Sequence, residues 1–356
     1  MHPRLAFDPM VRRVAWLVPP RVLHRCARWA LADRQVALCL HRVGGRLSPA
    51  PDAAPGLFIP GHVLDEVIRR ARGIGGERRW LTLSFDDGYR DAVRYVTLRA
   101  AQHPEIDWRV FVCPDKARRQ SGFRWDAGLN PLASLPCDTV ELIGENERPE
   151  LLRAGSDPTT AVASLEELRS LWERDASTVG NHTNSHLPLA GLPPELATLE
   201  LEASVACFER EVGPSRSFAF PFGTPGVYWG PEHASHLSSL GLEEIWSVQS
   251  RTFGAKERSC GAVLPRFPVD GRDSAHTILS LVVARASLER FRTRNLGSKQ
   301  AVAARLVRRG CGYELGQSLV PLGGVPLDAT AVVVNTEVFN HDLFHAFSNI
   351  THVVHP

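Results

Sequence analysis

The sequence predicts a parallel α/β fold, and three observations lead to this prediction. Apolar segments of strand length alternate with segments of helical periodicity up to about residue 270. Polar or turn-forming residues repeatedly follow the predicted strands, at His41, Asp86, His182, Phe222 and Arg266. In a parallel barrel the strand ends share one rim, where such barrels hold their active sites, so we expect these residues to converge.

The composition excludes several classes of protein. The chain has 356 residues, of which 44% are hydrophobic and 22% charged, as in globular domains. A formal net charge of +2 without an aromatic-interleaved basic stripe gives no sign of a nucleic-acid binder. The seven cysteines form no C-x-x-C pair, so neither a disulfide framework nor a zinc knuckle is indicated. No apolar run suits a signal peptide or a membrane span, which predicts a cytoplasmic protein.

Residues 1–34 are predicted to form a helical extension rich in Arg, Trp and Leu, with an amphipathic helix at residues 22–31. This helix either packs on the main domain or makes peripheral contact with a membrane surface. Packing is favoured, because a surface anchor normally has a stronger separation of basic and apolar faces.

The main domain is expected to cover residues 35–272. Its predicted strands are residues 35–40, 80–85, 107–113, 217–220, 244–248 and 262–264. Its predicted helices are residues 62–72, 89–102, 164–172, 194–211 and 232–240. Ser164 and Glu167, three residues apart, form a capping-box pattern at the start of the third of these helices. A proline begins the helix at residues 194–211, and Gly213 follows its end.

Two regions depart from the alternation of strands and helices. From residue 116 to about residue 160 the pattern dissolves into short pieces with Pro, Gly and Asn, too long for an ordinary connection. We expect an insertion here, as a lid or a substrate loop. Residues 273–356 have Arg-rich helical segments at 274–290 and 299–309 and a strand pattern at 328–335. They either form an appended α/β unit or complete and cap the barrel.

Asp86 and Asp87 end the apolar run of residues 80–85, and Gly88 follows them. Such a tripeptide is also a common turn. However, two charges beside a buried strand need partners or a metal ion. If one carboxylate binds a metal, its neighbour stays ionised and close enough to act as a general base.

His182 and His186 lie four residues apart, which on a helix or a tight turn places both rings on one side. One carboxylate and two histidines leave positions open for water and substrate, as a catalytic metal site requires. His341 and His345 have the same spacing but no carboxylate pair beside a strand, so we do not expect them to bind metal.

Three motifs together resemble the polysaccharide deacetylase family, the NodB homology domain. They are Ser-Phe-Asp-Asp-Gly at residues 84–88, Asn-His-Thr-Asn-Ser-His at 181–186 and Phe-Ala-Phe-Pro-Phe-Gly at 218–223. The resemblance extends over about residues 36–270 and implies a distorted parallel (β/α) barrel that removes N-acetyl or O-acetyl groups with a divalent metal. Residues 40–43 and 164–171, and Trp125 with Asp126, resemble the branch acting on poly-N-acetylglucosamine and related glycans.

The resemblance also implies roles for individual residues. Asp87, His182 and His186 would hold the metal, for which zinc, cobalt and nickel all suit the donor set. Asp86 would be the general base, and His41 the acid that protonates the departing amine. Many family members have an arginine where this chain has Ala219, so we assign the orienting of Asp86 to Arg266.

The substrate is expected to contact the third motif and nearby aromatic residues. A backbone N–H near Phe222 or Gly223, beside Pro221, would hold the oxyanion. Trp125, Phe222 and Trp246 either stack on a sugar ring or belong to the core.

The leading hypothesis is a metal-dependent N-deacetylase of an amino sugar in a glycan, glycolipid or nucleotide-sugar precursor, in exopolysaccharide biosynthesis. An O-acetyl esterase would use the same residues. A decayed carbohydrate-binding protein on this fold would lack turnover altogether. A membrane-surface assembly factor has only compositional support.

Overall fold

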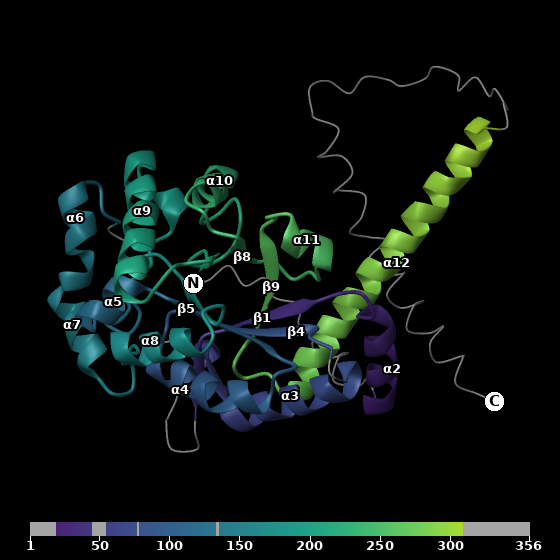
Figure 1. The fold of residues 1–356 in the computed structure, drawn as a ribbon, viewed down its shortest axis with the longest axis horizontal. Helices are drawn as coiled ribbons and strands as arrows, with labels where there is room; N and C mark the ends of the chain where they lie inside the picture. The colour runs from purple at the N-terminus through teal and green to yellow at the C-terminus, as the bar shows by residue number, and fades with distance from the viewer. Residues whose placement is uncertain (1–18, 45–54, 77, 133–134, 309–356) are drawn as a thin grey trace. The chain divides into compact units, whose positions relative to one another are not determined.

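The computed structural model describes residues 19–44, 55–76, 78–132 and 135–308. The chain divides into two units, residues 1–297 and 298–356. The first unit contains a closed barrel of parallel strands in the order β1-β4-β5-β6-β7-β8-β9, in which β9 pairs back onto β1 (Figure 1). This confirms the predicted parallel barrel. The strands are β1 (Val36–Leu40), β4 (Leu81–Phe85), β5 (Asp107–Val112), β6 (Val179–Asn181), β7 (Ser217–Ala219), β8 (Glu244–Val248) and β9 (Leu264–Pro268).

Helices connect the strands and cover the barrel, and a short parallel pair, β2 (Arg42–Gly44) and β3 (Phe58–Pro60), lies outside it. The α-helices are α2 (Pro20–Ala30), α3 (Gly61–Gly75), α4 (Arg90–Arg99), α5 (Pro114–Arg119), α6 (Thr139–Gly144), α7 (Pro149–Ser156), α8 (Leu165–Arg174), α9 (Pro194–Glu211), α10 (Pro231–Ser239), α11 (Ala255–Ser259) and α12 (Ala275–Arg308). The 3₁₀ turns are η1 (Pro55–Leu57), η2 (Ala100–Gln102), η3 (Glu145–Glu147) and η4 (Leu189–Gly191).

Two element predictions are wrong in detail, and the expected insertion contains short helices. The last barrel strand covers Leu264–Pro268 rather than residues 262–264, because Pro265 and Pro268 enter the ladder opposite Ser247 and Cys39. The region at 116–160 contains the helices α6 and α7, which are too short to show a clear periodicity in the sequence. The segments at 274–290 and 299–309 belong to one helix, α12. The strand pattern at 328–335, His341 and His345 lie outside the described residues.

Alternate residues of each strand face opposite sides of the barrel wall. In β1, Val36, Leu38 and Leu40 belong to the large core that includes residues of α2, α3, α4 and α12. Ala37 belongs instead to a separate buried cluster, whose other members are Phe111, Ala219, Trp246, Phe253 and Leu264. These side chains fill the barrel interior, so the barrel is a packed core rather than a pore.

An ionic cluster lies at the end of the barrel where the strands begin. Arg258 donates to Asp107, at the start of β5, over 2.8 Å and to Glu244, at the start of β8, over 2.7 Å. Arg109 lies 3.2 Å from Asp107 and 3.3 Å from Glu244. The guanidinium of Arg258 also lies 5.6 Å from the centre of the Trp246 ring, which joins this cluster to the packed interior.

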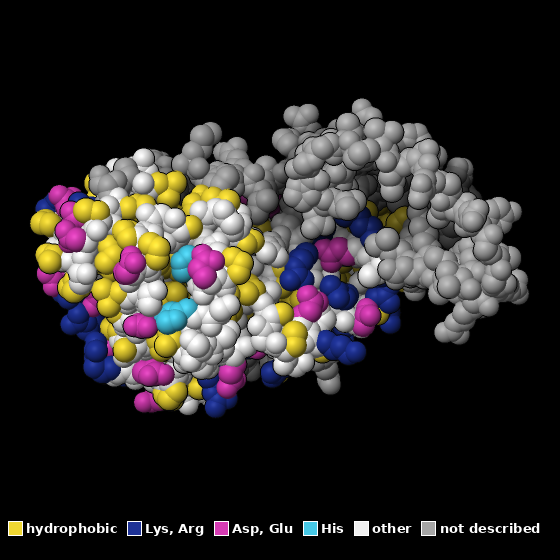
Figure 2. Space-filling view, turned by 90° about the horizontal axis from the view of Figure 1, so that it is seen from above, with side chains coloured by type: hydrophobic (Ala, Val, Ile, Leu, Met, Phe, Trp, Pro, Cys, Tyr) yellow, Lys and Arg dark blue, Asp and Glu magenta, His cyan; other side chains and the backbone are white. Residues whose placement is uncertain are grey.

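The surface differs between regions of the first unit. Val140 and Ile143 of α6 and Val227 are large hydrophobic side chains that are more than half exposed. Figure 2 shows hydrophobic side chains over α6, α9 and α10, whereas basic and acidic side chains alternate around α11. Among the described residues, no helix has the length and apolar character needed to cross a membrane.

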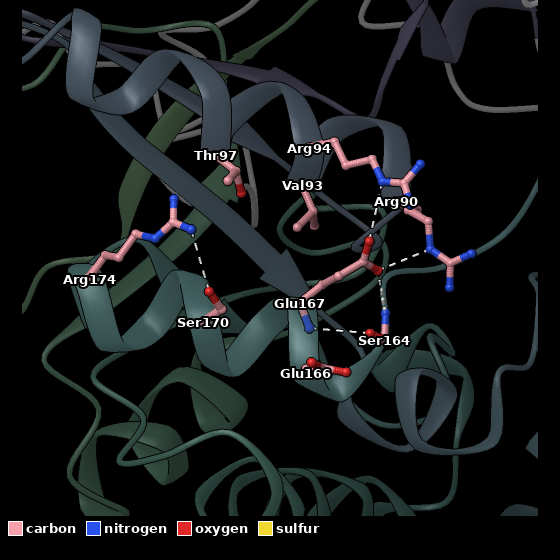
Figure 3. A pocket seen from close by; sticks show the side chains of 9 residues that line it. All are labelled: Arg90, Val93, Arg94, Thr97, Ser164, Glu166, Glu167, Ser170 and Arg174. Carbon is pink, nitrogen blue, oxygen red and sulfur yellow. Dashed lines mark hydrogen bonds and ion pairs between the residues drawn. The ribbon is translucent and has the colours of Figure 1, made fainter.

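The start of α8 has the capping box predicted from the sequence. The Ser164 hydroxyl accepts from Glu167 N over 3.2 Å, and the Glu167 carboxylate accepts from Ser164 N over 2.9 Å. Glu167 also pairs with Arg90 and Arg94 of α4, so the cap ties α8 to α4 across an open groove of about 530 Å³ (Figure 3). None of the predicted site residues lines this groove.

We predict that Ser164→Ala lowers the free energy of unfolding by about 1 kcal/mol, because it leaves an N-terminal N–H of α8 without its acceptor. Chemical denaturation measures this loss. Ser170→Ala, on the same helix, is the matched control and should leave stability nearly unchanged. Equal stability of Ser164→Ala and wild type would contradict the assigned cap.

Candidate metal centre and active site

Six predicted site residues come from four different parts of the barrel. Asp86 and Asp87 follow β4, His41 lies between β1 and β2, and Arg266 lies within β9. His182 and His186 belong to the loop that follows β6, and neither residue is helical. The structure brings all six side chains together at the end of the barrel where the strands finish.

Asp87, His182 and His186 form a buried group of potential metal ligands. Oδ1 of Asp87 lies 3.6 Å from Nε2 of His182 and 3.0 Å from Nε2 of His186. Ligand atoms about 2.1 Å from a tetrahedral metal are roughly 3.4 Å apart, so the spacing suits one ion. Among the described residues, neither carboxylate oxygen of Asp87 has a hydrogen-bond partner. A buried carboxylate without donors is costly, and a bound cation would remove that cost.

The histidine loop has an unusual backbone. Thr183 and His186 have φ angles of +63° and +56°, and Asp87 across from them has a φ of +74°. These left-handed conformations are uncommon for residues other than glycine. Side chains hold the loop in place: Thr183 N donates to Asn181 Oδ1 over 2.9 Å, and His186 N donates to Thr183 Oγ1 over 3.1 Å. Such strain is concentrated at functional sites.

A hydrogen bond fixes the tautomer of His182, and burial favours the neutral form of both histidines. Nδ1 of His182 lies 2.7 Å from the carbonyl oxygen of Ala219, which can only accept, so Nδ1 carries the proton. Nε2 of His182 is therefore unprotonated, lies on the side of Asp87 and can act as a metal ligand. Burial lowers the pKa of His182 to about 4, although Asp86 opposes the shift. Burial and the Lys116 charge lower the pKa of His186 to about 3.

Asp86 is held by an arginine from inside the barrel. Nη1 and Nη2 of Arg266 lie 2.5 Å and 2.9 Å from the two carboxylate oxygens of Asp86. Arg266 is fully buried, and Nη1 also donates to Ser84 Oγ over 3.2 Å. Burial alone would raise the pKa of Asp86, but Arg266 and His182 hold that pKa well below its usual range. Asp86 is therefore ionised and oriented.

Ala219, at the position where the motif resemblance implies an arginine in many proteins, belongs to the barrel interior. Its side chain belongs to the interior cluster with Phe111 and Trp246, and its carbonyl accepts from His182. The guanidinium that reaches Asp86 comes instead from β9, and it lies 5.2 Å from the centre of the Phe111 ring. Arg266 thus supplies the positive charge beside Asp86 from another strand.

His41 lies beside Asp86 at the rim and is only partly buried. A nitrogen of its ring, Sγ of Cys39 and a carboxylate oxygen of Asp86 lie within 4.8 Å of one another. The Cys39 thiol donates to Asp86 Oδ2 over 3.4 Å. A partly exposed imidazole next to an ionised carboxylate suits a group that exchanges protons.

Aromatic side chains surround His186. The ring centres of Trp125 and Phe222 lie 5.1 Å and 5.0 Å from that of His186, and Trp125 stacks on Phe123 at 4.9 Å. Pro221 is buried beside Phe222. At Gly223, φ is +68° and an added Cβ would lie 2.2 Å from Val248 Cγ2, so the turn requires glycine.

Of the two alternatives for Trp246, stacking on a sugar ring and packing in the core, the structure supports the core, and its place among the candidate substrate-binding residues is wrong. Its ring is fully buried in the barrel interior, 6.4 Å from Phe111 and 5.8 Å from Phe253 between ring centres. An apolar strand residue alternates between the two faces, and sequence alone did not indicate which face Trp246 takes.

Several residues near the site were not predicted from the sequence. Tyr89 donates to Asp126 Oδ2 over 2.6 Å and accepts from Trp125 Nε1 over 2.9 Å. Burial raises the pKa of Asp126 to about 6. The Trp-Asp dipeptide was a usable signal for Asp126. Lys116, Asn146 and Glu200 are also buried polar residues near the histidine loop, and nothing in their local sequence distinguishes them from surface residues.

Comparisons with known proteins place these observations in context. No protein-family model matches the chain, and no curated protein matches its sequence. A polysaccharide deacetylase from Bacillus cereus shares 13% identity over 70% of this chain and 69% of its own, with a TM-score of 0.47. The deacetylase PplD from Streptococcus pyogenes, solved with acetate, shares 13% identity over 70% of this chain and 98% of its own, with a TM-score of 0.48. A de-N-acetylase from Aggregatibacter actinomycetemcomitans shares 14% identity over 70% of this chain and 100% of its own, with a TM-score of 0.47. Likeness at this level does not assign an activity, which we argue from the site.

We predict that the metal-free protein loses stability as the pH falls below about 6.5, because of His182 and His186. Their folded pKa values lie below the ordinary 6.5, so the unfolded chain binds protons that the folded protein does not. Above about pH 6.5 the free energy of unfolding keeps its full value. As the pH falls towards about 4, the unfolded chain takes up protons and the free energy of unfolding decreases, by about 1.4 kcal/mol per unit of pKa shift.

Denaturation of the chelator-treated protein across this pH range measures the effect. His182→Asn should show a weaker dependence of stability on pH than wild type, whatever its absolute stability. The same change at the exposed His62 should leave the dependence as it is. If His182→Asn keeps the full wild-type slope, His182 is not held neutral by burial.

Proposed function

We propose that this protein is a metal-dependent deacetylase that hydrolyses the N-acetyl group of an amino sugar. The observation that carries the proposal is the buried Asp87 carboxylate, which has no hydrogen-bond donor among the described residues and lies between two histidine Nε2 atoms. Three protein ligands leave room for a water molecule and a substrate oxygen. The motif resemblance supplies the reaction class.

Asp87, His182 and His186 would hold the ion, and their donor set suits zinc, with cobalt or nickel as alternatives. When bound, such an ion polarises an acetyl carbonyl and lowers the pKa of water. Both histidines can bind an ion without first losing a proton, because burial keeps their rings neutral. The hydrogen bond from Nδ1 of His182 leaves its Nε2 available as the ligand atom.

Asp86 is the proposed general base. Its ionised carboxylate lies beside the metal ligands, with Oδ2 3.9 Å from His182 Nε2, and it can accept a proton from the attacking water. Arg266 keeps the carboxylate oriented and disperses its charge. The ion pair with Arg266 orients Asp86 but also lowers its pKa, so the carboxylate is a weaker base held in a fixed position.

His41 is the proposed acid for the departing amine. A nitrogen of its ring lies within 4.8 Å of Cys39 Sγ and of a carboxylate oxygen of Asp86. Breaking the C–N bond requires a proton on nitrogen, and a partly exposed histidine can supply it near neutral pH. For an acetyl ester the alcohol oxygen would need the same proton, so ester substrates belong in the first screen.

Trp125 and Phe222 would form the walls against which a sugar ring packs, on both sides of His186. A backbone N–H of the turn at Phe222 or Gly223 would donate to the oxygen of the reacting carbonyl. The poly-N-acetylglucosamine branch resembled by the sequence, and glycolipid and nucleotide-sugar precursors of exopolysaccharides, define the substrates to test.

We predict that the metal-loaded protein releases acetate from a panel of N-acetylated and O-acetylated sugars, nucleotide sugars and oligosaccharides. Chelation should abolish release, and zinc or cobalt should restore it. Asp86→Asn should lower kcat by at least about 100-fold while leaving metal binding intact, because the base is lost but the ligands remain. Asp33→Asn, a surface change, is the matched control.

Acetate measured by a coupled assay and metal content measured by mass spectrometry separate the outcomes. A wild-type protein that binds metal and releases acetate from no substrate in the panel would favour the carbohydrate-binding alternative. A protein that binds no metal would remove the basis of the proposal.

We predict that His41→Gln lowers kcat by about 100-fold or more on N-acetyl substrates. The loss should be much smaller on an activated ester such as a nitrophenyl acetate, because its leaving group departs without a proton. Equal losses on both substrates would contradict the assignment of His41 as the acid. His62→Gln, at an exposed position, serves as the surface control.

A further inference from the structure

The loop that carries the two histidines is held from behind by a buried glutamate. Glu200, on α9, accepts from Asn184 N over 2.9 Å and from Ser185 N over 2.6 Å through Oε1. Its Oε2 lies 3.3 Å from the Ser185 hydroxyl, which donates to it. Only 2% of Glu200 is exposed. These contacts fall between the two proposed ligands, His182 and His186.

An asparagine from the insertion holds the other side of the same peptide segment. Asn146, in η3, is 1% exposed, and its Nδ2 donates to the Asn184 carbonyl over 3.0 Å. The same Nδ2 donates to Asp115 Oδ2 over 2.9 Å, which ties the contact to α5. Asn184 therefore has its N–H bound by Glu200 and its C=O bound by Asn146.

A carboxylate at position 200 is difficult to explain by packing alone. Its neighbours on the buried face of α9 include Leu196, Ala197, Leu201 and Val205, so an apolar residue would bury its surface at lower cost. Burial raises the pKa of Glu200 to about 7, and the N–H groups of Ser185 and Asn184 and the buried Lys116 oppose that shift. Burial outweighs these groups, so it is the three hydrogen bonds to residues 184 and 185 that tie Glu200 to the loop.

We propose that Glu200 and Asn146 are positioning residues that fix the peptide of Asn184, so that His182 and His186 are held in ligand geometry before an ion binds. The inference rests on the proposed function, because it concerns the same metal site. It also gives part of the insertion a task different from a lid or substrate loop: η3 and α5 form a support for the ligands.

The contacts of Glu200 and Asn146 reduce the number of conformations that the metal-free loop can adopt. Thr183 and His186 both have positive φ, so the unbound loop would relax without external restraints. Restraining it in advance means that the ion does not have to order its own ligands, which strengthens binding. Partners behind first-sphere ligands typically change metal affinity by about 10-fold to 100-fold.

The test is the affinity of the full-length protein for Co²⁺ and Zn²⁺, measured without any substrate by cobalt absorption and by chelator competition. Glu200→Gln keeps the shape of the side chain but offers an NH₂ group or one neutral oxygen to the two N–H donors. We expect its metal affinity to fall about 10-fold to 100-fold. Asn146→Ala removes the donor to the Asn184 carbonyl and should give a loss of the same kind. Glu202→Gln, two residues from Glu200 and half-exposed, is the matched control.

Hydrogen exchange in the metal-free protein supplies a second readout. The amides of Asn184 and Ser185 should exchange faster in Glu200→Gln than in wild type, while amides of β4 and β8 keep their protection. A purely structural role would lower thermal stability with metal affinity unchanged, and that result in both Glu200→Gln and Asn146→Ala would overturn the inference. If Glu200→Gln does not fold, Asn146→Ala alone decides.

The outcomes also separate this inference from the proposed function. If wild type binds metal and releases acetate but both variants bind metal as wild type does, the positioning role is wrong and the deacetylase proposal stands. If wild type binds no metal, the proposed function fails, and this inference fails with it. If both variants lose affinity, the inference holds whether or not the right sugar has been found.

Discussion

The structure depends on the burial of two adjacent carboxylates at the end of β4. Asp86 and Asp87 are 3% and 2% exposed, and charges so placed need compensation. The protein compensates them in different ways: Arg266 forms a two-point ion pair with Asp86, whereas no described side chain donates to Asp87. One carboxylate is satisfied by the fold, and the other is available to an ion. This division between neighbouring residues underlies the assigned roles of base and ligand.

The barrel makes this division possible because its strand ends bring residues from distant parts of the chain together. Arg266 is separated from Asp86 by 180 residues, yet β9 and β4 both pair with β1, so their side chains meet inside the wall. His182 is oriented in the same way, by the carbonyl of Ala219 at the end of the neighbouring β7. A backbone carbonyl thus orients His182, and a side chain orients Asp86.

Sequence predicted what depends on local pattern and missed what depends on tertiary contact. Asp86, Asp87, His182 and His186 could be found because each follows a strand in a motif, and Ser164 because a capping box is a local signal. The short helices α6 and α7 and the strand with Pro265 lack such a signal. For Trp246 the sequence left sugar stacking and core packing open, because periodicity does not say which face of a strand looks inward. Glu200 resembles any other glutamate of α9, since its acceptor role exists only once the histidine loop packs against it.

The packed interior and the ionic cluster around Arg258 have a consequence for the traffic of small molecules. Phe111, Trp246 and Phe253 occupy the barrel axis, and Asp107, Glu244 and the two arginines close its far end. Within the described residues the site is therefore closed on the side of the barrel interior, and any water or ligand that reaches the two carboxylates passes through the rim formed by the strand ends.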